Sequence, residues 1–261
     1  MNAVLHPARA QDEGMSSRRV LKAYVEEMRS ECLRYARNPG FIVPVLIFSC
    51  MFYLLFVVVL TPPGQNAGTY MLASYSVFGV MSPGLFGFGV SLATERDNGL
   101  LTLKRALPMP PAAYLLGKMV MAMIAAAIVV VLLVAMAFSL GHASLSVGQV
   151  LALFVTDVLG VLPFCALGMW MGTLIKGQGA PGLLNLVYLP MSFLSGLWVP
   201  LPMLPAALQR LAPVFPSYHL AQIALDDVGM QQVSVLPHVV VLAGFTLVFL
   251  GLAVRRLRRH G

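Results

Sequence analysis

Charged residues in the middle of the chain are concentrated in one stretch, residues 95–118, which reads ERDNGLLTLKRALPMPPAAYLLGK. A short helix carrying Glu95, Arg96, Asp97, Lys104 and Arg105 would offer both signs of charge to a soluble partner. Charge complementarity of this kind sets the register and specificity of a protein contact more than its affinity. The alternative is an ordinary solvated connector between two apolar segments, whose basic residues only follow the positive-inside rule.

No catalytic or metal-binding pattern stands out elsewhere. The five histidines, at positions 6, 142, 219, 238 and 260, are scattered, and Cys32, Cys50 and Cys165 are too far apart in sequence to suggest a disulfide framework or a zinc site. Gly117-Lys118 lacks the upstream glycine and the following hydroxyl residue of a phosphate-binding loop. We therefore expect no catalytic residue, no metal site and no cofactor in this chain. If the protein uses ATP, another chain binds ATP and Mg²⁺.

Asp157 is the one acidic residue inside a predicted membrane span. A carboxylate at the centre of a bilayer costs about 2.5 to 3.5 kcal/mol on insertion scales, so this side chain should face protein or water. Two interpretations stay open: Asp157 lines the path of a transported molecule, or it has an interfacial or packing role.

The composition indicates a multi-span membrane protein. Hydrophobic residues make up 59% of the 261 residues and charged residues only 10%, whereas a soluble domain carries about a quarter charged residues. The net charge of +7 does not indicate a nucleic-acid partner, because the basic residues lie beside the ends of apolar segments and do not form one face.

The pattern predicts an all-α protein with four parts. Residues 1–15 form a disordered tail, 16–40 a basic amphipathic helix at the membrane interface, 41–254 a transmembrane domain and 255–261 a basic tail that anionic lipid would attract. Apolar periodicity and the positions of proline and glycine predict six transmembrane helices. They cover about residues 41–60, 71–92, 119–140, 150–175, 181–199 and 235–254.

The basic residues predict the orientation of these spans. Every Lys and Arg except Arg210 lies in the N-terminal segment, in residues 95–118, at Lys176 or after residue 254. With six spans, all of these segments fall on one side of the membrane. The positive-inside rule then makes this side the cytoplasm, with both termini in it.

Two groups of residues resemble the permeases of the ABC-2 (ATP-binding cassette type 2) exporters. The first group comprises Glu95-Arg96-Asp97, Gly99, Pro108 and Gly117-Lys118; the second comprises Phe193-Leu194-Ser195-Gly196, Pro200, Leu204-Pro205 and Leu208-Gln209. The chain departs from the family pattern at Asp97, where Glu is usual, at Leu100, where Thr is common, and at Met109-Pro110-Pro111, which replaces polar residues.

The resemblance implies a permease subunit of an ATP-driven exporter in the cell (inner) membrane. Its partners would be a separate cytoplasmic ABC ATPase and a second permease, in a homodimer or heterodimer, and segment 200–235 would form short re-entrant helices on the outer face. The first group of residues would be the ATPase-coupling loop, with Glu95, Arg96, Asp97 and Gly99 in the partner-facing turn. We expect an amphipathic or lipid-linked cargo, because the spans offer almost no charge for a polar solute. The alternative is an ATP-independent secondary carrier or a membrane-embedded lipid-modifying enzyme.

Overall fold

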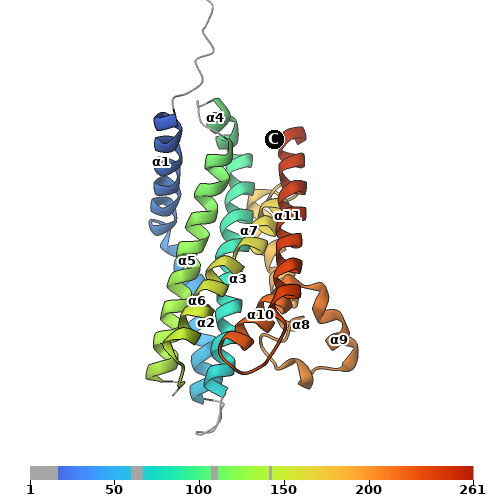
Figure 1. Cartoon of the computed structure of the whole chain (residues 1–261). Helices are drawn as coiled ribbons and strands as arrows, with labels where there is room; N and C mark the ends of the chain where they lie inside the picture. The colour runs from blue at the N-terminus through green and yellow to red at the C-terminus, as the bar shows by residue number, and fades with distance from the viewer. Residues whose placement is uncertain (1–16, 60–66, 107–110, 141–142, 261) are drawn as a thin grey trace, which may run out of the picture.

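The computed structural model describes residues 17–59, 67–106, 111–140 and 143–260, and these residues form helices and no strand (Figure 1). The predicted tail 1–15 and Pro108 lie outside the described residues. The α-helices are α1 (Ser17–Ala36), α2 (Pro39–Leu54), α3 (Ala67–Asp97), α4 (Leu100–Ala106), α5 (Pro111–Ser139), α6 (Val147–Gly160), α7 (Leu162–Gly172), α8 (Ala180–Leu194), α9 (Ala206–Leu211), α10 (Pro216–Asp227) and α11 (Val235–His260). A π-helical turn, η1 (Leu55–Val59), ends α2, and 3-10 turns η2 (Gly177–Gly179), η3 (Leu201–Met203) and η4 (Ala212–Val214) connect later helices.

Four segments of the described chain are long and apolar enough to cross a membrane, namely Gly68–Asp97, Ala112–Ser139, Val147–Gly172 and Val235–Leu257. They coincide with the predicted second, third, fourth and sixth spans. The predicted first span corresponds to α2 and η1, whose described apolar part is the shorter Ile47–Val57. The predicted fifth span corresponds to α8, which has 15 residues where about 20 are needed to cross the hydrocarbon core. The all-α fold is confirmed, and the count of six spans stays a prediction.

Helix α3 is the centre of the bundle and contacts α2, α5, α7, α8 and α10. Small residues allow its closest contact, with α7. A Cβ atom on Gly168 would lie 2.4 Å from the carbonyl oxygen of Leu85, and one on Gly172 would lie 2.7 Å from that of Gly89. Gly168 and Gly172, four residues apart on α7, therefore let the two backbones touch.

The predicted fourth span, 150–175, is not one continuous helix. Helix α6 ends at Gly160 and α7 begins at Leu162, so that Pro163 occupies the first turn of α7. A proline is tolerated there because the amide it lacks would have no partner within the helix. Pro163 thus marks a break between two shorter helices.

The start of the charged stretch is also helical. Helix α3 continues past the predicted end of the second span at residue 92 and includes Glu95, Arg96 and Asp97 in its last turn. Gly99 then reverses the chain with a φ of +72°, a left-handed conformation that glycine adopts without strain. Helix α4 follows directly, so residues 95–106 of the predicted loop form the end of α3, a tight turn and α4.

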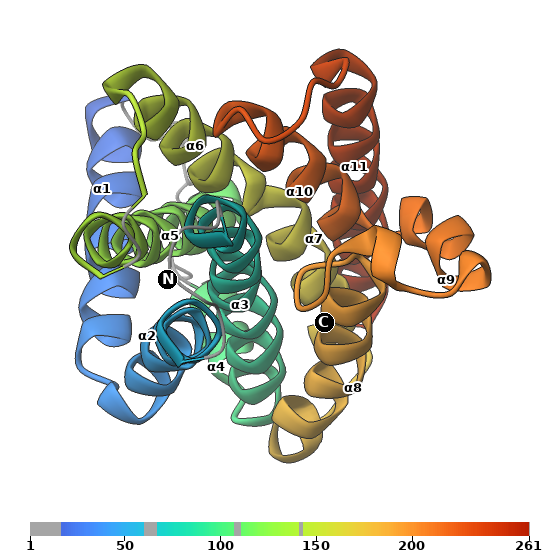
Figure 2. The same ribbon diagram turned by 90° about the horizontal axis from the view of Figure 1, so that it is seen from below.

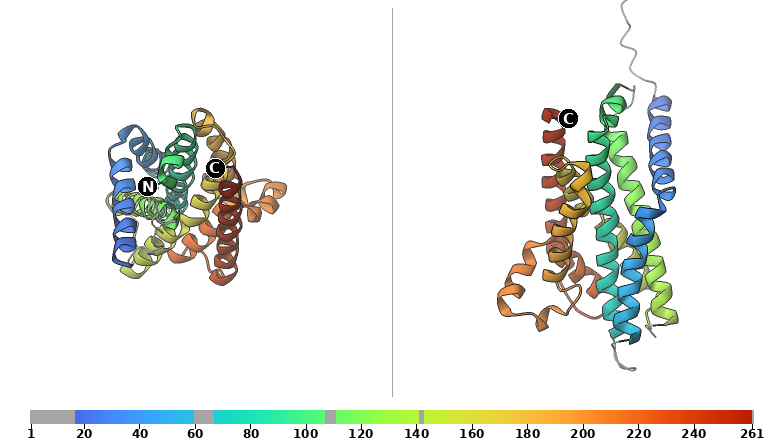
Figure 3. Two further views of the ribbon diagram at one scale, coloured as in Figure 1. Left: turned by 90° about the horizontal axis from the view of Figure 1, so that it is seen from above. Right: turned by 180° about the vertical axis from the view of Figure 1, so that it is seen from behind.

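The elements define two ends of the molecule. The beginning of α1, the turn before α4 and the end of α11 lie at one end, and α9, α10 and the beginning of α11 lie toward the other (Figure 1). Seen along the bundle, α5 appears end on while α1 is seen along its length, so α1 crosses α5 obliquely (Figure 2). The short helix α9 projects sideways from the bundle (Figure 3). Segment 200–235 does form short helices, whereas their re-entry into a membrane stays a prediction.

Candidate functional site

Lys118 on α5 is the centre of a charge network and is 0% exposed. Its Nζ lies 2.9 Å from Glu95 Oε1 at the end of α3, 3.1 Å from Glu31 Oε2 on α1 and 2.5 Å from Ser91 Oγ. A buried ammonium group is tolerated only when it is paired and hydrogen-bonded. Here two carboxylates from two other helices supply that compensation.

Glu95 is 4% exposed, and both of its carboxylate oxygens have partners. The hydroxyl of Tyr114 on α5 donates to Oε2 at 2.8 Å, and the hydroxyl of Ser91 donates to Oε1 at the same distance. The Arg34 guanidinium on α1 forms ion pairs with both Glu95 and Glu31. Helices α1, α3 and α5 are therefore joined through shared charges.

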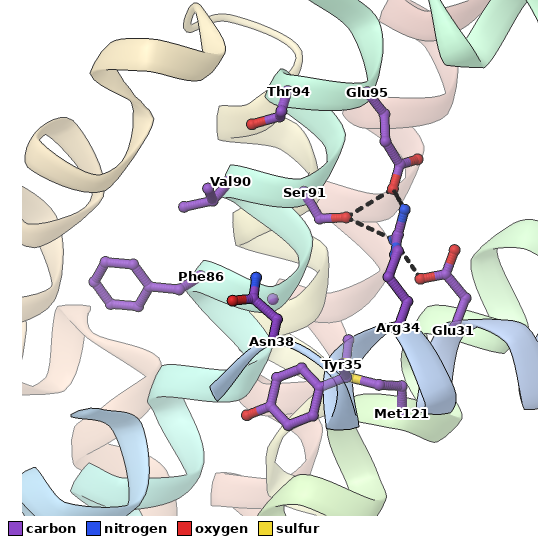
Figure 4. A pocket seen from close by; sticks show the side chains of 11 residues that line it. Glu31, Arg34, Tyr35, Asn38, Phe86, Val90, Ser91, Thr94, Glu95 and Met121 are labelled. Atoms are coloured by element: carbon purple, nitrogen blue, oxygen red, sulfur yellow. Dashed lines mark hydrogen bonds and ion pairs between the residues drawn. The ribbon is translucent and has the colours of Figure 1, made fainter. Parts of the chain in front are cut away.

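Arg34 lies at the edge of this network, beside a pocket of about 210 Å³ between α1 and α3 (Figure 4). The lining combines the charged groups Glu31, Arg34 and Glu95 with the apolar side chains of Phe86, Val90 and Met121. Burial alone would lower the pKa of Arg34, but the neighbouring charges of Glu95 and Glu31 outweigh it and the pKa is raised. The guanidinium thus keeps its charge.

Lys104 attaches α4 to the same network. Its Nζ lies 2.5 Å from Glu27 Oε1 and 3.1 Å from Glu31 Oε1, and it stands over the Tyr114 ring at 4.6 Å from the centroid. Burial alone would lower the pKa of Lys104, but its hydrogen bond to Glu27 and the charge of Glu31 raise it overall. The helix that follows the tight turn is therefore held against α1.

A second set of contacts fixes the end of α3 to the connection between α7 and α8. The Arg96 guanidinium donates to the carbonyl oxygens of Thr173 and Ile175, the latter at 2.7 Å. The backbone amide of Gly177 donates to Asp97 Oδ2 at 2.7 Å. A Cβ on Gly177 would lie 2.8 Å from Thr94 Cα, so glycine is required for this approach.

These contacts change the expected orientation of the predicted coupling residues. Glu95 and Lys118 face the interior of the chain, and Gly117 lies against Glu27 of α1, where an added Cβ would come within 3.3 Å of its Cγ. Glu95 therefore does not face a partner in this structure. Among the residues of the turn and of α4 whose side chains are described, Asp97, Asn98, Gly99, Thr102 and Leu103 are exposed.

The acidic side of α1 was not predicted to be part of the site. Glu27, Glu31 and Arg34 recur at helical spacing and turn toward α3, α4 and α5. The apolar residues Leu21 and Val25 of the same helix are exposed. The signal that could have revealed this face is the i, i+4 pair of glutamates in an otherwise basic helix.

Asp157 lies apart from this network, on α6, and is fully buried. Neither of its carboxylate oxygens has a hydrogen bond of normal geometry to a described residue. Its burial agrees with the expectation that the side chain faces protein, and a position near the membrane interface stays a prediction. A role in the path of a transported molecule stays a prediction.

Long apolar helices around a central helix, with α1, α4 and the end of α11 at one end, fit a multi-pass membrane protein. The sequence comparisons give the family. The family model described as ABC-2 family transporter protein matches residues 61–255. The chain is 30% identical over 197 residues to a Bacillus subtilis (strain 168) protein named "Putative transport permease YvfS". The matched region covers 73% of this chain and 79% of that protein. The chain therefore belongs to the ABC-2 transporter family and is a membrane permease of that class.

Proposed function

We propose that this permease is the membrane subunit of an ATP-driven exporter and that a separate cytoplasmic ABC ATPase binds to the turn between α3 and α4. The observation that supports this proposal is the charge network, because it connects that turn to three helices of the bundle. Both motif ends, Glu95 and Lys118, take part in it.

Helix α4 has two sides with different surroundings. Leu103 is 66% exposed and is available to a partner, whereas Lys104, the next residue, binds Glu27 and Glu31 on α1. Removing one partner from a buried ion pair costs about 3 to 5 kcal/mol, so elements joined by such pairs move together more easily than apart. A displacement of α4 by the ATPase would therefore carry α1 and the ends of α3 and α5 with it.

We further propose that two permease protomers form the cargo path and that the cargo is amphipathic or lipid-linked. The centre of this bundle is filled by side chains of α3 and its neighbours. By contrast, α8 and α11 carry large exposed apolar residues such as Leu186, Leu236 and Leu247. Apolar faces of this kind suit a path between protomers or next to lipid better than a path for a charged solute.

The test uses substitutions at the exposed side of α4. Leu103→Asp is expected to abolish co-purification of an ABC ATPase from the native membrane and the ATP turnover that accompanies it. The matched control is Met203→Asp, because Met203 is 74% exposed in η3, at the opposite end of the molecule. Equal ATPase recovery with both variants would contradict the proposed contact, and loss of ATPase with Met203→Asp alone would place the contact at the other end.

A further inference from the structure

A pocket of about 210 Å³ lies between α1 and α3, beside the charge network (Figure 4). One part of its lining is charged and polar, and the other part is apolar. Such a lining suits a ligand that combines an anionic headgroup with a hydrocarbon chain. We propose that this pocket binds an anionic phospholipid, with the phosphate group at Arg34 and one acyl chain along α3.

The lining of the pocket follows one stripe of α3. Thr94, Val90 and Phe86 recur every fourth residue, so they follow one another along the same face of the helix, as Figure 4 shows. The eight residues from Phe86 to Thr94 cover about 12 Å of helix. Thr94 is near the end of the apolar segment Gly68–Asp97, whereas Phe86 lies deeper in it, and Met121 of α5 adds to the apolar lining. The lining therefore changes from polar to apolar as a phospholipid changes from headgroup to chain.

Arg34 has hydrogen-bond donors left for a ligand. Its Nη2 donates to Glu31 and, at 3.0 Å, to Ser91 Oγ, and its Nη1 pairs with Glu95. A guanidinium group carries five N–H donors, so these contacts to described residues leave about two of them for other acceptors. The Arg34 side chain is 43% exposed, which makes those donors accessible. The planar guanidinium also matches the geometry of phosphate oxygens.

The carboxylates in the lining do not repel an anion, because the charge network pairs them with cations. This network joins three carboxylates and three basic groups, namely Glu27, Glu31, Glu95, Arg34, Lys104 and Lys118. Their formal charges cancel. The charge at the mouth of the pocket therefore depends on the residues outside the network.

Those outer residues are mostly basic. Arg34 also borders an open hollow on α1, which Arg29 and Arg37 line together with one acidic residue, Glu26. The hollow and the pocket meet at Arg34. A phosphate group at this point would thus have an excess of positive charge around it.

A free phosphate ion would use only part of this site. It would contact Arg34 but would bury no hydrocarbon against Phe86, Val90 and Met121. Burial of each CH₂ group adds to the affinity, and a chain combined with basic residues binds more stably than either alone. The proposal does not need the ATPase contact, because occupancy of the pocket is measured on the permease alone.

The experiment is a lipid titration of the delipidated permease in detergent, followed by native mass spectrometry. The two lipids are phosphatidylglycerol and phosphatidylcholine with the same acyl chains. We expect one phosphatidylglycerol per chain at saturation, with an affinity about fivefold or more above that of phosphatidylcholine, as one basic residue near an anionic lipid contributes. Arg37→Gln should lower the phosphatidylglycerol affinity about fivefold for the same reason.

Arg18→Gln is the matched control, since it makes the same charge change in the first turn of α1, away from the pocket, and should bind as the wild type does. Arg18 and Arg37 are both exposed, so neither substitution removes a buried group. Equal affinity of the wild type for the two lipids, or equal losses in the two variants, would overturn the proposal. Either result would leave only a general attraction of a basic helix for anionic lipid.

Val90→Trp tests the apolar part of the pocket. Val90 lines the pocket and is partly exposed, so the larger side chain would occupy the space of the acyl chain and abolish saturable binding. Glycerol 3-phosphate, which carries the phosphate without any chain, should not displace the lipid at equal concentration. Wild-type affinity in a folded Val90→Trp permease, or displacement by glycerol 3-phosphate, would contradict a lipid site.

Discussion

Lys118 Nζ lies 2.9 Å from Glu95 Oε1, although 23 positions separate the two residues in the sequence. The two ends of the charged stretch therefore meet inside the protein. Glu31 of α1 contacts the same ammonium group at 3.1 Å, so the pair is part of a three-helix contact. Stability and any transmission of motion at this end both depend on the pair.

Replacing Lys118 by Met should destabilise the permease strongly. The substitution preserves the approximate volume of the side chain but leaves Glu31 and Glu95 buried with one cation fewer. Breaking a buried pair in this way costs about 3 to 5 kcal/mol, which thermal unfolding in detergent would detect. Lys176→Met is the control, because Lys176 is exposed, and it should change stability by less than about 0.5 kcal/mol. Similar losses in both variants would show that Lys118 is not held in the network.

The charge of Lys104 should make part of the stability sensitive to alkaline pH. Its pKa is raised in the folded protein, so the folded state holds this proton more tightly than the unfolded state does. The stabilisation is complete below the ordinary lysine pKa of about 10.4 and is lost as pH rises through the raised value. The unfolding temperatures of the wild type and Lys104→Gln should therefore converge as pH rises above about 10. A constant difference across that range would contradict the ion pairs with Glu27 and Glu31.

Gly168→Ala should disrupt the contact between α3 and α7. The new methyl group would meet the backbone oxygen of Leu85 at 2.4 Å, and backbone cannot move aside as a flexible side chain can. We expect a loss of about 1 to 3 kcal/mol, as for overpacking in a tight core, measured by thermal unfolding in detergent. Gly244→Ala in α11 is the control, since a Cβ there meets nothing within 4 Å and alanine favours the helix. A neutral Gly168→Ala would show that the two backbones do not touch.

The orientation in the membrane can be tested with single cysteines in a background without Cys32, Cys50 and Cys165. Asn98→Cys and Gln178→Cys lie near the charge network and should react with an impermeant thiol reagent only after the cells are permeabilised. Arg210→Cys and Gln231→Cys lie in the segment between α8 and α11 and should react in intact cells. All four positions are exposed, so access does not depend on unfolding. The reverse labelling pattern would place the basic end outside the cell.

The helical fold could be predicted because long apolar runs and glycine spacing depend on residues close in sequence. The ends of helices were less predictable. Glu95, Arg96 and Asp97 look like a loop because hydropathy falls there, yet α3 continues through them. It can do so because residues from α1, α5 and the connection after α7 compensate their charges. Those partners lie up to 80 positions away and leave no local signal.

Function was predicted best where spacing within one segment carried the information. Glu95 and Lys118 were both named as residues of the coupling loop, and Glu95 was expected in the partner-facing turn, whereas the two side chains pair with each other. Glu31 was not identified, because a glutamate on a basic helix looks like an ordinary solvated residue. The hydrogen bond between His219 and His238 could not be predicted either, because only the packing of α10 against α11 brings these two rings together.

Helix α3 has 31 residues, so it is about 46 Å long, and Pro83 lies inside it. Its last turn belongs to the charge network, while its body contacts α10 near the other end of the molecule. If a helix of this length tilts as a unit by about 5°, one tip is displaced by about 4 Å relative to the other. Small movements at the charged end would therefore reach the opposite membrane surface without any helix having to unfold.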